Sequence, residues 1–284
     1  MKVGIGLPNT VPGADGALLV EWARRADAGP FGTVAVLDRL VYDSHEPFVT
    51  LAAAAAVTRR VGLATMIAIG PLRSAAMLAK QAATVDAISG GRLTLGLGVG
   101  ARLDDYEAAG VDHRGRGVRL SEQLAYLRGA GDDAGPRIPI LVGGHDDAGP
   151  GIPILVGGNS GPALLRMARY ADGYAHGGGP PRAFGSAASR ARAAWHDLGR
   201  PGEPALWGQG YFAFGDPDRG TAYLRDYYAF TGPFAEKIAA GCLTTPRAIK
   251  DFVRGYQAEG CDELILLPTV PDPDELDRLA EVLA

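Results

Sequence analysis

Short apolar segments of the strand type alternate with longer helix-like segments along almost the whole chain. The strand-like segments span 3–7, 33–37, 61–69, 93–99, 152–156, 173–176, 205–214 and 263–267. Each is followed by at least one stretch in which apolar residues recur at helical spacing, as they do in 16–28. Continuously apolar strands, such as ELILL and IPILV, are typical of a parallel sheet buried on both faces. Eight such units predict a closed (β/α)8 TIM barrel, with an open doubly wound sheet as the alternative.

A fourteen-residue phrase occurs twice in succession, as DDAGPRIPILVGGH at 132–145 and DDAGPGIPILVGGN at 146–159. The second copy leads through its glycine pair into a helix-like stretch, whereas turn-forming residues follow the first. We therefore expect the second copy to supply the fifth strand, and the reverse assignment is the alternative. The chain is then a single barrel domain, 1–284, with 132–151 as an insertion. That insertion would either cover the mouth of the barrel or pair at its rim and form a subunit interface.

Composition and charge narrow the classes of partner. A chain of 284 residues with 47% hydrophobic content can bury one large core. Its net charge of −4 offers no basic field for nucleic acid or an anionic membrane, and its apolar stretches are too short to span a bilayer. The two cysteines form no disulfide framework, and no metal-type spacing is present. We expect a cytoplasmic protein that binds no nucleic acid, membrane or metal.

In a barrel of this kind the chemistry lies at the carboxyl ends of the strands. That rule selects Asn9 after the first strand, Asp38 and Arg39 after the second, and the segment from Val99 and Gly100 to Arg102 after the fourth. The Asp38–Arg39 pair is either a polar contact to a ligand or a surface ion pair. His45, in the loop that follows, is the best candidate for proton transfer because its pKa is tunable, although a loop histidine is commonly just exposed.

The turn after the fifth strand consists of Gly157, Gly158, Asn159, Ser160 and Gly161. Glycines let a phosphate approach the backbone, and the N–H groups at the start of the next helix attract an anion. The asparagine amide and the serine hydroxyl would add donors. The alternative is a glycine-rich turn that caps the helix and binds nothing.

Two long motifs identify a family resemblance. The segment PLRSAAMLAKQAATVDAISGGRLTLGLGVGARLDDYEAAGV at 71–111 resembles the bacterial luciferase-like flavin-dependent oxidoreductases, whose hallmark is AKQAATLDxLSGGRLxLGxGxG. LVGGNSGPALLRMARYADGY at 155–174 is similar to the fifth βα unit of that family. The resemblance implies a barrel that binds FMN, or the deazaflavin coenzyme F-420, at its mouth, with the phosphate on the turn at 157–161. It also implies a non-proline cis peptide at Met66–Ile67, against the ring of the cofactor.

One position departs from the family. Many relatives carry a histidine directly after the acidic residue that ends the second strand, and here that residue is Arg39. A guanidinium cannot act as a general base near neutral pH. Arg39 would instead stabilise an anionic reduced flavin or a peroxide, and His45 could replace the missing histidine only if its loop folds inward.

The leading hypothesis is a flavin-dependent oxidoreductase or monooxygenase that uses reduced FMN and oxygen on a small organic substrate. A flavin reductase would supply the reduced cofactor, and the family favours a homodimer. One alternative is an F-420-dependent hydride-transfer enzyme, and another is a barrel that has lost its cofactor and acts as a binding or structural protein. Aromatic residues make up only 7% of the chain, and their distribution defines no substrate pocket.

Overall fold

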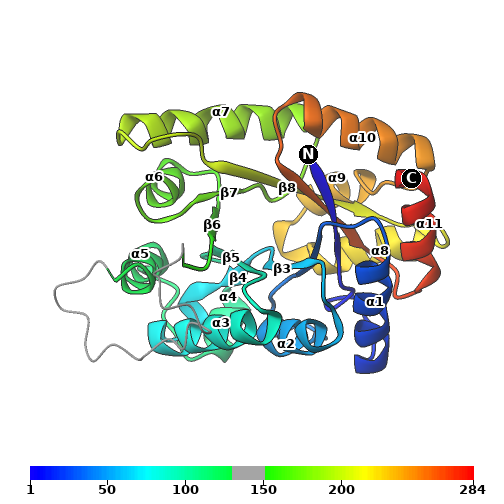
Figure 1. Cartoon of the computed structure of the whole chain (residues 1–284), viewed down its shortest axis with the longest axis horizontal. Coiled ribbons are helices and arrows are strands. Elements are labelled where there is room, and N and C mark those ends of the chain that lie inside the picture. The colour runs from blue at the N-terminus through cyan, green and yellow to red at the C-terminus, as the bar shows by residue number, and fades with distance from the viewer. Residues whose placement is uncertain (130–150) are drawn as a thin grey trace.

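The computed structural model describes residues 1–129 and 151–284. In these residues, parallel strands form one closed sheet (Figure 1). The strands are β1 (Lys2–Gly6), β2 (Thr33–Val36), β3 (Gly62–Thr65), β4 (Ala68–Ile69), β5 (Leu93–Gly98), β6 (Ile154–Gly157), β7 (Gly173–Ala175), β8 (Ala205–Phe212) and β9 (Glu263–Pro268). Their order is β3-β2-β1-β9-β8-β7-β6-β5-β4, and β3 also pairs with β5, so the sheet closes. Because β3 and β4 both pair with β5, they are two halves of one barrel strand. The predicted (β/α)8 barrel is confirmed, and the open sheet is wrong.

Helices cover the outside of this barrel (Figure 1). Those in the described residues are α1 (Gly16–Ala28), α2 (Pro47–Val57), α3 (Ala75–Ser89), α4 (Leu103–Ala108), α5 (Arg116–Leu127), α6 (Gly161–Tyr170), α7 (Pro181–Asp197), α8 (Pro217–Tyr227), α9 (Phe234–Ala240), α10 (Pro246–Ala258) and α11 (Asp274–Leu283), with 3-10 turns at Gly70–Leu72 and Ala229–Thr231. Side-chain caps fix several of their first turns. Ser74, for example, accepts a hydrogen bond from the backbone N–H of Met77 at the start of α3.

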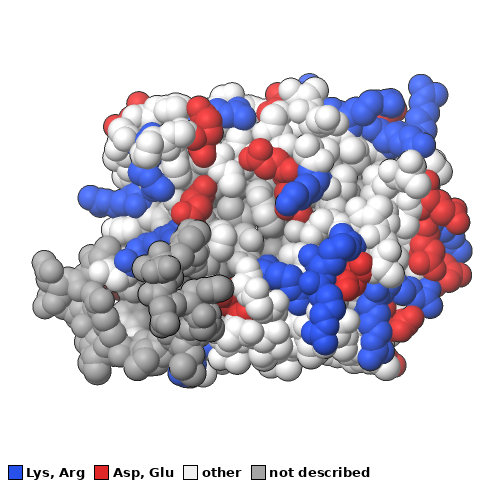
Figure 2. All heavy atoms as spheres, viewed as in Figure 1, with Lys and Arg blue, Asp and Glu red and all other residues white. Residues whose placement is uncertain are grey.

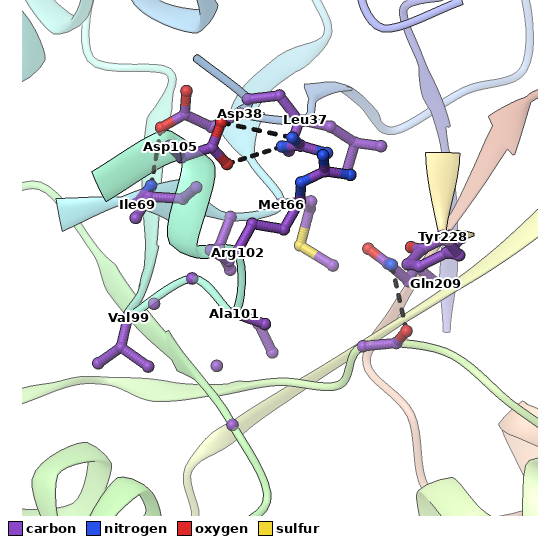
Figure 3. A pocket seen from close by; sticks show the side chains of 18 of the residues that line it. Leu37, Asp38, Met66, Ile69, Val99, Ala101, Arg102, Asp105, Gln209 and Tyr228 are labelled. Carbon is purple, nitrogen blue, oxygen red and sulfur yellow. Dashed lines mark hydrogen bonds and ion pairs between the residues drawn. The ribbon is translucent and has the colours of Figure 1, made fainter. Parts of the chain in front are cut away.

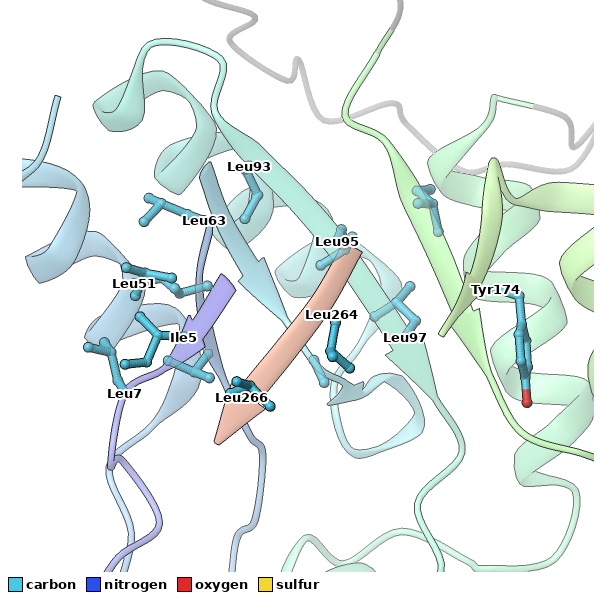
Figure 4. Close-up of a cluster of buried hydrophobic side chains, with 14 of the residues drawn as sticks. Ile5, Leu7, Leu51, Leu63, Leu93, Leu95, Leu97, Tyr174, Leu264 and Leu266 are labelled. Carbon is cyan, nitrogen blue, oxygen red and sulfur yellow. The ribbon is translucent and has the colours of Figure 1, made fainter. Parts of the chain in front are cut away.

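The core has two parts, because successive side chains of a strand point to opposite faces. In β9, Leu264 and Leu266 belong to the buried cluster that holds most of the buried helical side chains, and they face the helices (Figure 4). Ile265 and Leu267 belong to a second cluster, which fills the inside of the barrel. Both faces of the sheet are thus buried, as its continuously apolar strands predicted.

The second copy of the repeated phrase supplies the fifth barrel strand. β6 lies within it and pairs with β5 through Leu95 and Ile154, and with β7 through Leu155 and Gly173. This confirms the assignment made from the helix that follows. The first copy, 132–145, lies outside the described residues, as does nearly all of the predicted insertion.

Charged side chains of both signs are interspersed over the face shown in Figure 2, and its described residues form no single basic field. Of the helices in 1–129 and 151–284, none combines the length and the apolar character needed to cross a bilayer. Cys242 and Cys261 are both free thiols, which agrees with the absence of a disulfide framework in the sequence.

Close packing between neighbouring strands gives a first testable prediction. A Cβ on Gly173 of β7 would lie 2.2 Å from the backbone oxygen of Ala205 on β8. Gly173→Ala should therefore destabilise the protein by about 2 kcal/mol or more, because a backbone atom cannot move aside as a flexible side chain can. The measurement is the midpoint of urea unfolding. Gly16→Ala is the matched control, since a Cβ there meets nothing within 4 Å; equal midpoints for the two variants would contradict the prediction.

Candidate functional site

A cavity of about 370 Å³ lies at the carboxyl ends of the barrel strands. Its walls come mainly from the segments that follow β2, β3, β5, β6 and β7, and from the end of α8. The predicted site residues that line it are Asp38, Arg39, Met66, Ile67, Val99, Gly100, Arg102, Gly157 and Gly158. Figure 3 shows Asp38 and Asp105 on one side of this pocket and Gln209 and Tyr228 on the other. The cavity has the size and the concave, largely apolar form of a small-molecule site.

The apolar side of the cavity includes the break between β3 and β4. The peptide bond between Met66 and Ile67 is cis, as the resemblance implied. Glycines make room for Ile67: a Cβ on Gly98 would lie 2.7 Å from Ile67 Cδ1, and one on Gly157 would lie 3.4 Å from Ile67 Cγ2. The glycines of these strand ends therefore let Ile67 pack tightly beside the cavity.

Asp38 is buried and acts as an anchor for the neighbouring strand. Its carboxylate accepts hydrogen bonds from the backbone N–H of Ile69 at 2.8 Å and from Arg73 Nη1 at 2.6 Å. Burial acts to lower the pKa of Arg73, but Asp38 and Glu46 outweigh it and raise that pKa, so the guanidinium stays charged. Asp38 therefore holds the end of β2 to β4 and to the segment after it.

Arg39 points to a different carboxylate. Its Nε donates to Asp105 Oδ2 at 2.8 Å, and its side chain is only 5% exposed. The guanidinium carbon lies 5.5 Å from the ring centre of Tyr42 and 5.4 Å from that of Tyr227. Its Nη1 is buried and has no hydrogen-bond partner. The interpretation of Asp38 and Arg39 as a surface ion pair is wrong, because both are buried and each pairs with another residue.

Aromatic and polar side chains close the opposite wall. Tyr227, Tyr228 and Phe230 come from the end of α8 and the turn after it, His176 directly follows β7, and Gln209 is in β8. Burial raises the pKa of Tyr228, so its hydroxyl remains protonated at neutral pH. Burial also lowers the pKa of His176, which favours the neutral imidazole. The aromatic residues thus do gather at the pocket, contrary to the expectation from their distribution in the sequence.

The glycine turn after β6 lies partly inside and partly beside the cavity. Gly157 and Gly158 line it, and Gly158 has a φ of 120°, which favours glycine. Asn159, Ser160 and Gly161 are exposed next to it. Ser160 caps α6 by accepting from the N–H of Ala163, and its O–H group can still donate. Arg190 Nη1 donates to the backbone oxygen of Asn159 at 3.0 Å, which brings a positive charge to this turn.

Two predicted residues lie away from the cavity. His45 Nε2 is 2.8 Å from the backbone oxygen of Ala14, and His45 lines a separate hollow beside α1 and α2. Its loop does not fold inward, so the structure does not support it as the proton-transfer group. Asn9 is buried. Its side-chain amide donates to the backbone oxygen of Leu37 and accepts from the backbone N–H of Leu37, which fixes the end of β2.

Sequence reasoning missed Asp105, Tyr227 and Tyr228. Asp105 stands in the first turn of α4, where an acidic residue is also favoured by the helix dipole, so its sequence context gave no distinct signal. The tyrosines stand in the run YYAF, which a search for aromatic clusters near a helix end would have found.

The chain belongs to the luciferase-like monooxygenase family, whose model matches residues 1–260. An uncharacterized protein of Mycobacterium tuberculosis is 32% identical over 194 residues, which cover 59% of this chain and 67% of the relative. A second uncharacterized protein of that species is 35% identical over 105 residues, which cover 37% of each chain. The sequence resemblance to this family is thereby confirmed.

Solved structures of the same architecture include enzymes with two kinds of cofactor. An F-420-dependent secondary alcohol dehydrogenase, in complex with an F-420–acetone adduct, superposes with a TM-score of 0.80 at 16% identity, over 99% of this chain and 97% of that one. The FMN-bound oxygenating constituent of 3,6-diketocamphane monooxygenase from Pseudomonas putida superposes with a TM-score of 0.73 at 14% identity, over 99% and 95%. At these identities the likeness concerns the fold.

Neighbouring aspartates provide a test of the buried ion pair. Asp105→Ala should cost about 3–5 kcal/mol of stability, because it removes the carboxylate hydrogen-bonded to the buried Arg39 and leaves only Asp104, at 3.9 Å, as an ion-pair partner. Asp104→Ala is the control: its side chain is 38% exposed, and its loss should cost under about 1 kcal/mol. Urea unfolding measures both. The pair Arg39→Met with Asp105→Asn, which removes both charges, should lose less than Asp105→Ala alone; a larger loss would contradict this account.

Proposed function

We propose that the chain is a flavin-dependent oxidoreductase of the monooxygenase type, which uses reduced FMN and oxygen on a small organic substrate. The observation that carries the proposal is the wall of the central cavity, which combines the apolar side chains of Met66 and Ile67 with the charged residue Arg39. The positive charge of Arg39, beside a largely apolar cavity, favours an anionic group there. An anionic reduced flavin ring provides one.

The remaining walls fit a flat ring with a phosphate tail. Met66, Ile67 and Val99 offer an apolar surface for the ring. The turn at 157–161 offers glycine backbone at the edge of the cavity, with Arg190 beside it. The bound FMN would supply the redox chemistry, and the protein would supply orientation, charge and a site from which water is excluded.

The residues of the cavity divide the other tasks. Arg39 cannot take up a proton, so its role is electrostatic. Tyr228 is held in its protonated form and can donate a hydrogen bond to a substrate oxygen. His176 lines the same cavity and is held neutral by burial, so it is the histidine that we propose for proton transfer. His176 thus takes the place that the sequence analysis offered to His45.

An F-420-dependent hydride-transfer enzyme is the second candidate. It is supported by the TM-score of 0.80 with an F-420-dependent secondary alcohol dehydrogenase, against 0.73 for the FMN-bound enzyme. Turnover that needs oxygen would favour the first function, and turnover without oxygen would favour the second. A homodimer, a supplying flavin reductase and a cytoplasmic location remain predictions.

The deciding experiment is a pair of fluorescence titrations of the purified chain, one with FMN and one with F-420. Saturable binding of FMN, with a stoichiometry near one, supports the first function. Saturable binding of F-420 alone supports the second. Binding of neither cofactor would contradict both proposed functions and would favour a barrel that acts as a binding protein without a cofactor.

Removal of the Arg39 charge should change the redox properties of the bound FMN. In the double variant Arg39→Met with Asp105→Asn, the Asn oxygen can still accept from the backbone N–H groups of Leu40 and Val41, as Asp105 does. Reduced FMN should bind about tenfold more weakly relative to oxidised FMN, which corresponds to a fall of about 30 mV in the two-electron midpoint potential.

Arg190→Met is the matched control for this measurement. Arg190 lies at the predicted phosphate turn and away from the ring, so its loss should weaken both redox forms alike and leave the potential unchanged. Spectroelectrochemical titration reads the potential directly. An unchanged potential in the double variant would show that Arg39 does not contact the ring.

A further inference from the structure

A second cavity, of about 450 Å³, adjoins the first. The two share Gly177, in the segment after β7, and Tyr228, after α8. The walls of the second cavity come from the glycine-rich segment 177–181, from β8, from α9 and from Phe252 of α10. Each cavity alone has the volume of a small-molecule site, so a cofactor ring and a substrate can be accommodated side by side.

The inner wall of the second cavity is largely apolar, and its two hydroxyl groups lie next to each other. Tyr211 and Tyr228 form a hydrogen bond between their hydroxyl oxygens at 2.5 Å. Burial raises the pKa of Tyr228 and raises that of Tyr211 well above its ordinary value, so both phenols are neutral. Phe252 and Ile238 complete the wall. This end suits the uncharged body of a ligand.

The outer end of the second cavity carries one positive charge. Lys237 of α9 is the only charged residue among those that line this cavity. It is exposed, and it makes no ion pair within the described part of the chain. The ring of Phe234, 56% exposed, lies beside it at 6.0 Å from the ammonium nitrogen. An exposed aromatic ring next to an unpaired cation gives the mouth of the cavity both apolar and anion-binding character.

We propose that the second cavity is the substrate site and that it takes an elongated, mostly apolar organic anion. The apolar body lies against Phe252 and Ile238, and its terminal carboxylate or similar group pairs with Lys237. The opposite end of the molecule reaches Tyr228 and Gly177, where the two cavities meet. This inference rests on the proposed function, because it assigns the first cavity to the cofactor ring.

The test uses displacement of the fluorescent probe 1-anilinonaphthalene-8-sulfonate, which itself combines an apolar body with an anionic group. Sodium decanoate should displace the probe more effectively than 1-decanol, which has the same chain without the charge. Butanoate should compete far more weakly than decanoate, because each buried methylene strengthens binding about fourfold. Equal displacement by decanoate and 1-decanol would overturn the anion assignment.

Two variants locate the site. Lys237→Met keeps the apolar stem and should weaken decanoate about three- to fivefold, as expected for an exposed ion pair, with no effect on 1-decanol. Lys250→Met, on the exposed side of α10, is the matched control and should change neither. Ile238→Trp fills the cavity and should weaken decanoate at least tenfold, with the melting temperature confirming that the variant is folded. Unchanged decanoate binding in a folded Ile238→Trp protein would overturn the site.

Titration of the same variants with FMN and F-420 separates this inference from the proposed function. Both cofactors should bind the Lys237→Met and Ile238→Trp proteins as they bind the parent. A weaker affinity for a cofactor with unchanged decanoate affinity in Lys237→Met would overturn the inference, since the lysine would then serve the cofactor tail. A chain that binds decanoate as expected but neither cofactor would overturn the proposed function alone.

Discussion

The mouth of the barrel depends on the carboxylate of Asp105. This side chain is almost fully buried, and it accepts hydrogen bonds from Arg39 and from the backbone N–H groups of Leu40 and Val41. It therefore ties the segment after β2 to the short helix that follows β5. A buried charge is tolerated only when it is matched and hydrogen-bonded, and Asp105 meets both conditions. Without it, Arg39 would lose its hydrogen-bonded carboxylate, and the N–H groups of Leu40 and Val41 would lose their acceptor.

Asp38 makes the complementary connection. It turns away from its neighbour Arg39 and binds Ile69 and Arg73, so two successive residues link the end of β2 to two different parts of the barrel. Both carboxylates are consequently occupied by protein donors. Among the residues that line the cavity, Arg39 Nη1 and His176 Nε2 are buried and have no hydrogen-bond partner.

The sequence was sufficient for the barrel and for much of the site, because both follow from short-range patterns. Strand ends are marked by glycine and by polar residues, and in a parallel barrel every carboxyl end meets at the same mouth. The role of Asp105 could not be read in this way, since its partner Arg39 is 66 residues away and nothing local distinguishes it from Asp104. His45 failed for a related reason: its place in the chain was right, but the direction of its loop depends on Asn9 and Ala14.

The repeated phrase shows how a strand is chosen when local propensity cannot decide. Both copies contain the same IPILVGG segment, so their intrinsic preference for a strand is the same. Only the second is followed by residues that begin a helix, with Ser160 as the cap and Leu164 and Met167 buried against the sheet. A barrel strand is stable only when a helix covers its outer face, because that face is otherwise left in water. The copy that supplies β6 is therefore the one whose sequence continues into a covering helix.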